Sequence, residues 1–345
     1  MNTVNPRART MTTAKSDKSD AGPGEFELIR RFFMRPGAVS RGDSGVILGI
    51  GDDAALLAMP AHSELAATVD TIIEGRHFPT DTDARSIGHR ALAVNLSDLA
   101  AMGAIPAWAT LALTVPSADS KWLQRFSDGL LGLADAHGVT LVGGDTTRGP
   151  LTISVQVLGH VPRGTAMRRS GARAGDLLAV TGTLGDAGAG LALVSATCLA
   201  QDRALADQLI RRFEYPEPRV QFGQAARGIA SAAMDLSDGL AGDLPKLASA
   251  SGLAAHVDID RLPMSPALRS VAAPEQARDW AMAAGDDYEL LVAVPQHRFA
   301  ELASAAARLD LRLTAIGELR SGTDVTWTLN GREFAIAVQG YDHFR

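Results

Sequence analysis

The chain has 345 residues, of which 46% are hydrophobic and 21% charged, as in a globular protein with room for two ordinary domains. Its formal net charge of −6 excludes a broad basic surface for nucleic acid, and its single cysteine, Cys198, excludes an intrachain disulfide and a cysteine-based zinc cluster. The longest uncharged run, residues 101–118, is interrupted by Pro106 and Pro116, so no membrane span is predicted and we expect a cytoplasmic protein.

The first half of the chain begins with a polar tail, residues 1–24, which lacks the apolar stretch of a signal peptide and is predicted to be disordered. Amphipathic and apolar runs then predict helices and strands, with Gly103 and Gly138 ending two of the helices. The helices are expected at 25–33, 84–102 and 120–137, and the strands at 44–51, 65–70, 106–116, 139–145 and 151–161.

A polar stretch rich in glycine and arginine, residues 162–176, is the predicted linker between an N-terminal domain, 25–161, and a C-terminal domain, 177–345. Helices and strands mix in both halves, which predicts an α/β or α+β fold class. In the second half, a strand, a glycine loop and a helix are expected within 177–196, further helices at 208–231 and 244–250, and strands at 254–260, 288–295 and 313–319.

Turns rich in glycine and aspartate recur beside the predicted strands. They are GIGDDAALL (49–57), VGGDTTRG (142–149), MDLSDGLAGD (234–243) and AAGDDYELLVAV (283–294). One such turn needs no function, because aspartate suits turns and helix N-termini. Their repetition favours a shared site.

The helix expected at 84–102 carries an aspartate on the same face as apolar residues. Ala91, Asn95, Asp98 and Met102 fall on one side of it. Ala91 and Met102 indicate that this side packs inward, so the Asp98 carboxylate needs a partner. That partner is either a cap or buried ion pair, or a metal ion.

Six aspartates lie at strand ends or on this helix face: Asp53, Asp70, Asp98, Asp145, Asp235 and Asp238. If they gather in one pocket, their mutual repulsion requires cations. Nearby hydroxyl groups, such as those of Thr68 and Ser237, and the lack of cysteine ligands favour hard cations, above all Mg²⁺. We therefore expect a single acidic pocket that binds several Mg²⁺ ions.

Phosphoryl transfer is the chemistry that best fits such a pocket. The chain has no GxxxxGK[ST] or GxGxxG sequence, and the glycine loop at 182–188 is more typical of a strand-to-helix turn than of a ligand loop. Lysine is scarce, so a phosphate would be bound by arginines such as Arg148, Arg168 and Arg169, by backbone N–H groups or by metal ions. Positioning and charge neutralisation supply most of the catalysis in this reaction class.

Seven stretches carry a family resemblance: GIGDDAALL, ALAVNLSDLAAMGAIPAWATLAL, LVGGDTTRGP, RRSGARAGD, VTGTLGDAGAGLAL, DLSDGL and GDDYELL. In order and spacing they resemble the thiamine-monophosphate kinases, a family of the aminoimidazole-ribonucleotide-synthetase-like ATP-binding superfamily. The resemblance runs from about Glu25 to the closing GYDHF. It implies an N-terminal domain whose sheet pairs with a second subunit in a homodimer, a C-terminal α/β domain, and transfer of the γ-phosphoryl group of ATP to thiamine monophosphate.

The resemblance also implies roles for individual residues. The Mg²⁺ ligands would be Asp53, Thr68, Val69, Asp70, Asp98, Asp145, Asp235 and Asp238, with Asp98, Asp145 and Asp238 central to catalysis. ATP would contact Gly144, Asp145, Arg169 and Ser237, and thiamine monophosphate would contact His77, Asp286 and Tyr341.

Two positions depart from the family pattern. Val69 stands where the family usually has a hydroxyl residue, so only its backbone carbonyl could bind a metal, and Asp286 replaces a glutamate that is one methylene longer. For His77 and Tyr341 the alternatives are a turn histidine and a packed aromatic ring.

Two other functions remain open on the sequence. One is another ATP-dependent enzyme of the superfamily. A selenophosphate synthetase would need a reactive cysteine and lysine near the N-terminus, whereas Cys198 lies mid-chain. The other is a non-catalytic protein that binds Mg²⁺ and a nucleotide, which would be expected to have lost one or more of the aspartates.

Overall fold

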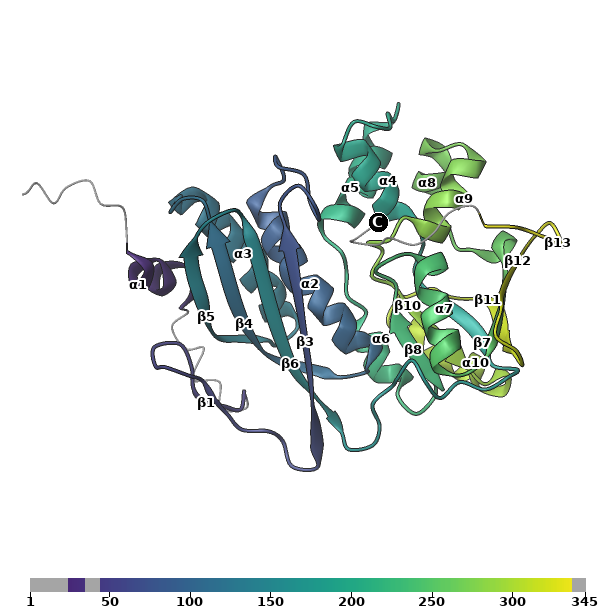
Figure 1. Ribbon diagram of the computed structural model, residues 1–345, viewed down its shortest axis with the longest axis horizontal. Coiled ribbons are helices and arrows are strands. Elements are labelled where there is room, and N and C mark those ends of the chain that lie inside the picture. Colours follow the sequence, from purple (N-terminus) through teal and green to yellow (C-terminus); the bar gives the residue numbers. More distant parts are fainter. Residues whose placement is uncertain (1–23, 35–43, 337–345) are drawn as a thin grey trace, which may run out of the picture.

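The computed structural model describes residues 24–34 and 44–336 (Figure 1). The tail predicted at 1–24, apart from Gly24, and the predicted substrate residue Tyr341 lie outside the described residues. Two large sheets with helices against them, and one small two-stranded sheet, form the described part, as expected for a two-domain α/β chain. The helix expected at 25–33 is a short α-helical turn, α1 (Glu25–Leu28), that continues as a π-helical turn (Ile29–Phe33).

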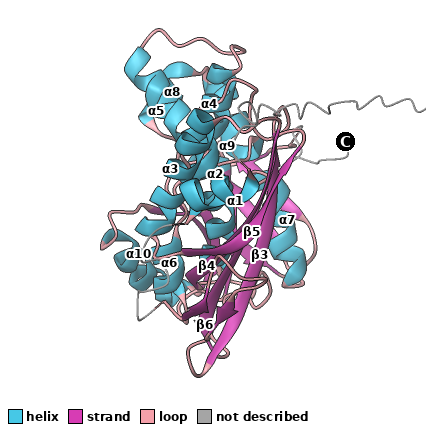
Figure 2. Ribbon diagram, turned by 90° about the vertical axis from the view of Figure 1, so that its left-hand side faces the viewer, coloured by secondary structure: helices cyan, strands magenta, loops and turns pink. Residues whose placement is uncertain are grey.

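The N-terminal half is built on a four-stranded sheet with the order β3-β6-β4-β5. Helices α2 (Ala84–Ala101) and α3 (Ser120–Ala136) cover one of its faces (Figure 2). The strands are β3 (Ser63–Ile73), β4 (Ile105–Val115), β5 (Thr140–Arg148) and β6 (Thr152–Pro162), of which β4 and β5 are parallel and the other pairs antiparallel. A hairpin of β1 (Val46–Leu48) and β2 (Leu56–Leu57) precedes them.

Helix α2 begins and ends where the sequence predicts. The Asp83 side chain accepts a hydrogen bond from the Arg85 N–H at its start, and Gly103 follows its last turn with φ 66°. Its contact with α3 depends on Gly88 of α2 and Gly129 of α3, because a Cβ on Gly88 would lie 2.0 Å from the Phe126 carbonyl oxygen and one on Gly129 would lie 1.9 Å from the Arg85 carbonyl oxygen. The helices can therefore approach backbone to backbone.

The C-terminal half is built on a seven-stranded sheet with the order β13-β12-β9-β11-β7-β10-β8. Only the β12–β9 pair among these is parallel. The strands are β7 (Leu177–Thr181), β8 (Ala232–Asp235), β9 (Ala254–Asp258), β10 (Leu290–Val294), β11 (Leu313–Arg320), β12 (Val325–Leu329) and β13 (Arg332–Glu333). The helices are α4 (Asp186–Val194), α5 (Arg203–Glu214), α6 (Val220–Ala226), α7 (Leu240–Ala250), α8 (Pro266–Val271), α9 (Pro274–Ala283) and α10 (Phe299–Ala307).

The prediction of one helix at 208–231 is wrong. Two helices, α5 and α6, occupy this region, and the chain between them contains Pro216 and Pro218, which cannot donate helical hydrogen bonds. Helices α8, α9 and α10 were not predicted from the sequence.

Helix α2 lies in the centre of the molecule and packs against elements of both halves. One apolar core joins residues of α2, of the four-stranded sheet and of the C-terminal elements, such as Phe222 of α6 and Val292 of β10. Asn95 of the predicted inward face is fully buried, whereas Met102 is 36% exposed. Among the described helices none is both long and apolar enough to cross a membrane.

Candidate active site

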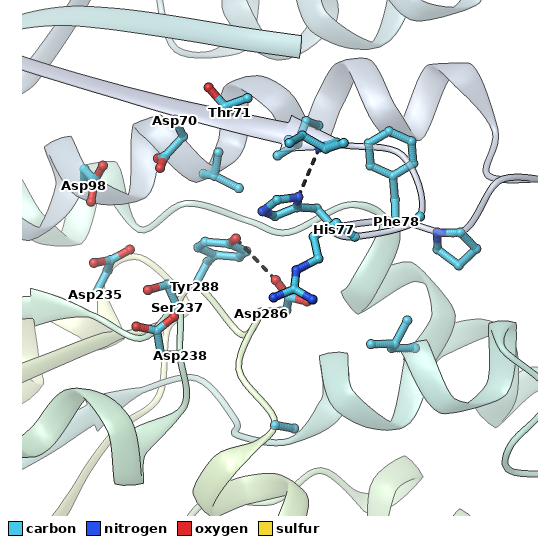
Figure 3. A pocket seen from close by; sticks show the side chains of 18 of the residues that line it. Asp70, Thr71, His77, Phe78, Asp98, Asp235, Ser237, Asp238, Asp286 and Tyr288 are labelled. Atoms are coloured by element: carbon cyan, nitrogen blue, oxygen red, sulfur yellow. Dashed lines mark hydrogen bonds between the residues drawn. The ribbon is translucent and has the colours of Figure 1, made fainter. Parts of the chain in front are cut away.

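A cavity of about 740 Å³ lies where the two halves meet. Figure 3 shows Asp70 and Asp98 of the N-terminal half on one side and Asp235, Ser237 and Asp238 of the C-terminal half on the other. His77, Asp286 and Tyr288 line the same cavity toward its other end. The fold thus brings together carboxylates that are far apart in the sequence.

The acidic end of the cavity is built by β3, α2 and the end of β8. Thr68 and Asp70 are two residues apart on β3, so both point toward α2. The Thr68 hydroxyl donates a hydrogen bond to Asp98 Oδ2. From the same turn of α2, the buried Ser97 hydroxyl donates to Asp235 Oδ2 over 2.9 Å.

The carboxylates of Asp70, Asp98 and Asp235 are poorly neutralised by the protein. Burial, together with the charge of Asp98, raises the pKa of Asp235 to about 7. Burial, and then the charge and hydrogen bond of Asp98, raises the pKa of Asp70 to about 6. The pKa of Asp98 is also raised by burial, although the Thr68 hydrogen bond and the positive charge of Arg169 oppose the shift. This is the pattern expected where bound cations complete a site.

The donor atoms suit Mg²⁺, because they are carboxylate and hydroxyl oxygens. Among the described residues, no three carboxylate, imidazole or thiol side chains are close enough to hold one ion by themselves. Mg²⁺ usually binds through one or two carboxylates together with water and substrate phosphates. The cluster therefore fits ions that bind along with a phosphorylated ligand.

Asp238 already has a protein cation beside it. Lys246 Nζ lies 2.5 Å from Asp238 Oδ2 and 2.9 Å from Asp243 Oδ1. The buried Asp243 also accepts the backbone N–H of Asp238 over 2.9 Å. Asp238 thus differs from Asp70 and Asp235, whose carboxylates repel other acids.

The loop at the other end of the cavity has an unusual backbone. Gly285, Asp286 and Tyr288 have φ angles of 72°, 61° and 49°, a region that side chains other than glycine rarely adopt. Backbone hydrogen bonds from Asp286 N to Ser237 O and from Tyr288 N to Leu236 O hold the loop against the Asp235–Asp238 segment. These backbone bonds therefore fix the position of the predicted substrate residue, Asp286, relative to the predicted metal ligands Asp235 and Asp238.

The residues after Asp286 anchor this loop to the rest of the C-terminal half. Asp287 accepts N–H bonds from Gly185, over 2.7 Å, and from Ala187. The glycine loop at 182–188 therefore binds a carboxylate of its own chain, which agrees with its prediction as a strand-to-helix turn. The fully buried Glu289 forms ion pairs with Arg212 and Arg219.

A second cavity, of about 650 Å³, is lined by Asp53, Gly144 and Asp145. Gly144 has φ 147°, and a Cβ there would lie 1.9 Å from the Leu111 carbonyl oxygen, so only glycine fits. Asp145 pairs with Ala112 of β4, which places it on the sheet face opposite Asp70. Two strands separate β3 from β5, which corresponds to roughly 14 Å between Asp145 and β3.

The expectation that all six aspartates share one pocket is therefore wrong for the single chain. Asp70, Asp98, Asp235 and Asp238 line the first cavity and Asp53 and Asp145 the second. Val69 is 61% exposed, and its side chain points to the same open sheet face as Asp145.

Three residues in or directly behind the wall of the first cavity were missed on the sequence: Tyr288, which lines it, and Ser97 and Arg90, which bind residues that line it. Arg90 and Ser97 are seven residues apart on α2, a spacing that puts them on one face, and this was the available signal. Tyr288 belongs to the GDDYELL stretch itself. It is buried, and it donates from its hydroxyl to Asp286 Oδ1 over 3.3 Å.

Comparisons with known proteins identify the family. The model for the N-terminal domain of AIR synthase related proteins matches residues 51–161, and the model for their C-terminal domain matches residues 173–330. Thiamine-monophosphate kinase of Escherichia coli (strain K12) is 47% identical over 322 residues, which cover 93% of this chain and 98% of that protein.

Solved structures agree with this family assignment. The crystal structure of thiamine-monophosphate kinase from Stenotrophomonas maltophilia K279a superposes with a TM-score of 0.81 at 47% identity, covering 86% of this chain and 94% of that one. AaThiL complexed with AMPPCP and TMP superposes with a TM-score of 0.74 at 30% identity, covering 83% of this chain and 89% of that one. The chain described here thus belongs to the AIR synthase related proteins and, among them, to the thiamine-monophosphate kinase family.

Proposed function

We propose that the chain transfers the γ-phosphoryl group of ATP to thiamine monophosphate, which gives thiamine diphosphate and ADP. The observation that carries the proposal is the facing arrangement of Asp70 and Asp98 against Asp235 and Asp238 in one cavity, with Asp286 at its other end. The family membership and the complex of AaThiL with AMPPCP and TMP support the same reaction.

The reaction brings two polyanions together. The acceptor is a phosphate oxygen that is already ionised at neutral pH, so no general base is needed, and the main barrier is electrostatic repulsion. Bound Mg²⁺ would neutralise the phosphates and orient them for in-line attack. The protein supplies buried carboxylates that repel one another, as their raised pKa values reflect, and a bound cation relieves that repulsion.

Each group of residues has its own role in this proposal. Asp70, Asp98, Asp235 and Asp238, together with the Thr68 hydroxyl, would hold Mg²⁺. Arg169, whose charge acts on Asp98, and Ser237 would contact the phosphates of ATP. His77 and Asp286 would contact thiamine monophosphate. Direct ligation through the Val69 carbonyl and a substrate contact from Tyr341 stay predictions.

We also propose that a second copy of the chain completes the site. The sheet face that carries Asp145 is open, and its edge strand β3 presents large apolar side chains there, with Leu65 54%, Val69 61% and Ile73 41% exposed. Several large exposed apolar side chains on one strand favour burial against another protein surface. Pairing of this face with the same face of a second copy would form a homodimer, in which Asp53 and Asp145 of one copy could approach the first cavity of the other.

The reaction is tested by incubating the purified chain with MgATP and thiamine monophosphate and measuring thiamine diphosphate and ADP. Stoichiometric formation of both is the expected result. Turnover of a purine precursor without thiamine diphosphate would instead favour another enzyme of the superfamily. Binding of ATP without turnover would favour a non-catalytic protein.

The homodimer is tested by light scattering after size-exclusion chromatography. Leu65→Glu puts a charge on the open sheet face, away from the acidic cavity, and is expected to give a monomer with little activity. Leu199→Glu is the control, because Leu199 is 87% exposed and lies outside the sheet. A monomeric wild-type chain with full activity would contradict this part of the proposal.

A further inference from the structure

Arg90 of α2 is a buried cation that crosses from the N-terminal half to the substrate end of the cavity. The residue is 3% exposed, and its guanidinium forms an ion pair with Asp286 through Nη2. Its Nη1 donates to the Phe213 carbonyl oxygen over 2.7 Å. The guanidinium also lies over the rings of Phe213, at 4.6 Å, and Tyr288, at 5.8 Å. Contacts on several sides fix its position.

Asp286 depends on such a fixed partner. Its φ of 61° places it in a backbone region that costs free energy for a residue with a side chain, so surrounding contacts must maintain it. Arg90 and the Tyr288 hydroxyl both bind Oδ1. Among the described residues these are the side-chain hydrogen bonds of the carboxylate, so Oδ2 is the oxygen available to a ligand in the cavity.

The short side chain of Asp286 makes a fixed partner at Oδ1 especially important in this chain. Asp286 has a short side chain, and a short carboxylate has less freedom to reach a ligand by rotation than a glutamate has. Its placement must therefore come from the loop backbone and from the group that holds Oδ1. Arginine suits this task, because its planar fork can bind the carboxylate and the Phe213 carbonyl together, which a lysine cannot do with the same geometry.

We propose that Arg90 is a positioning residue for thiamine monophosphate: it holds Asp286 so that Oδ2 accepts a hydrogen bond from the amino group of the aminopyrimidine ring. The inference rests on the proposed function, because it names the substrate of that site. Arg90 does not line the cavity, so it acts through Asp286 and makes no contact with the phosphates. It therefore affects the binding of thiamine monophosphate and leaves the binding of ATP and Mg²⁺ unchanged.

A purely structural role for Arg90 is the competing explanation. Loss of a buried ion pair would then destabilise the interface between the halves, and would lower kcat and raise the KM values for both substrates together. The two explanations differ in the KM values, since only a positioning role raises the KM for thiamine monophosphate selectively.

The experiment compares Arg90→Met, Arg90→Lys, Asp286→Ala and the double variant Arg90→Met/Asp286→Ala. We expect Arg90→Met to raise the KM for thiamine monophosphate about tenfold or more and to leave the KM for ATP within about twofold, with partial rescue in Arg90→Lys. The double variant is expected to be no worse than Asp286→Ala alone, because both changes remove one interaction. Calorimetric titration of thiamine monophosphate without ATP should show the same loss of affinity.

Arg125→Met is the matched control. Arg125 pairs with Asp83 at the start of α2, but its side chain is 59% exposed and lies outside the cavity. Thermal unfolding of every variant identifies those that fail to fold, and Arg90→Lys, which keeps the charge, serves where Arg90→Met does not fold.

Additive effects of Arg90→Met and Asp286→Ala, or equal rises in both KM values, would overturn the inference. So would a folded Arg90→Met variant with an unchanged KM for thiamine monophosphate. If the wild-type chain makes no thiamine diphosphate, the proposed function itself fails, and that outcome is seen before any variant is measured.

Discussion

Asp235 and Glu289 are buried carboxylates at adjoining ends of two neighbouring strands of the C-terminal sheet, and their pKa values move in opposite directions. Asp235 ends β8 and pairs with Leu290 of β10, directly after Glu289. Glu289 has Arg212, Arg219 and the Thr181 hydroxyl as partners, and the charge of Arg219 lowers its pKa despite complete burial. Asp235 has the Ser97 hydroxyl, and burial raises its pKa to about 7.

The opposite pKa shifts distinguish a carboxylate that stabilises the fold from one that can bind a ligand. Glu289 is neutralised within the chain, so it stabilises the fold and has no need of a ligand. Asp235 faces Asp70 and Asp98 across the cavity and has no cationic partner among the described residues, so it is poised to bind a cation. Two equally buried carboxylates can therefore have pKa values shifted in opposite directions, according to whether arginines or other acids surround them.

The largest effect on stability is expected for Glu289→Ala. The substitution removes the buried carboxylate that Arg212 and Arg219 share and leaves them only the exposed Glu217 as an acidic partner, so the free energy of unfolding should fall by roughly 3–5 kcal/mol. Urea unfolding measures this. Glu301→Ala breaks an exposed pair with Arg298 and should cost less than about 1 kcal/mol. Similar unfolding midpoints for the two variants would contradict the comparison.

Asp98→Asn and Asp145→Asn should affect activity much more than stability, in contrast to Glu289→Ala. We expect thiamine diphosphate formation to fall by at least about 10²–10³-fold, because phosphate neutralisation is lost. The unfolding midpoint without Mg²⁺ should stay the same or rise for Asp98→Asn, since one of the mutually repelling charges is removed. Wild-type kcat at saturating Mg²⁺ in either variant would show that its assigned role is wrong.

The pH dependence of the folding stability should differ with and without Mg²⁺. The folded-state pKa values of Asp70 and Asp235, about 6 and about 7, exceed the unfolded value of 3.8, so the folded chain binds more protons than the unfolded chain between these values. Without Mg²⁺, this contribution to stability is lost as the pH rises from about 4 to about 7.

Mg²⁺ binds the ionised carboxylates, so its stabilising effect should grow over the same range, by an amount on the order of 2 kcal/mol. Thermal unfolding at several pH values, with Mg²⁺ and with EDTA, measures this. Glu289→Gln is the control, because the lowered pKa of Glu289 acts only below its usual value of 4.5. A stabilisation by Mg²⁺ that is equal at pH about 5 and about 7.5 would speak against the acidic cluster as the metal site.

The smallest effect is expected for Lys246→Met. Lys246 competes with Mg²⁺ for Asp238, but its side chain is 43% exposed and solvent screens its charge. Its loss should tighten Mg²⁺ binding by no more than a few-fold, as measured by a titration of activity and of the unfolding midpoint. The exposed Lys121→Met provides the control. Weaker binding in Lys246→Met would mean that Lys246 orients Asp238 for the metal instead of competing with it.

Much of the local structure was predictable because local signals determine it. The helix at 84–102 has an N-cap aspartate at Asp83 and a C-terminal glycine at Gly103, and the structure places α2 within one residue of these limits. The strands of the first sheet were also placed correctly, although β3 extends beyond the predicted 65–70 at both ends. The helices that begin at Pro266 and Pro274 were missed, since their short stretches give little periodicity.

The sequence by itself determined the helix limits, the strand-end aspartates and, through its motifs, the family. Only the tertiary structure decided how the carboxylates are grouped, because a β-strand directs alternate side chains to opposite faces of the sheet. Asp70 therefore meets Asp98 and Asp235 beside α2, and Asp145 lies on the open face and lines the second cavity with Asp53. Which buried carboxylate acquires arginines as partners was likewise set by contacts between segments far apart in the chain, which no local pattern records.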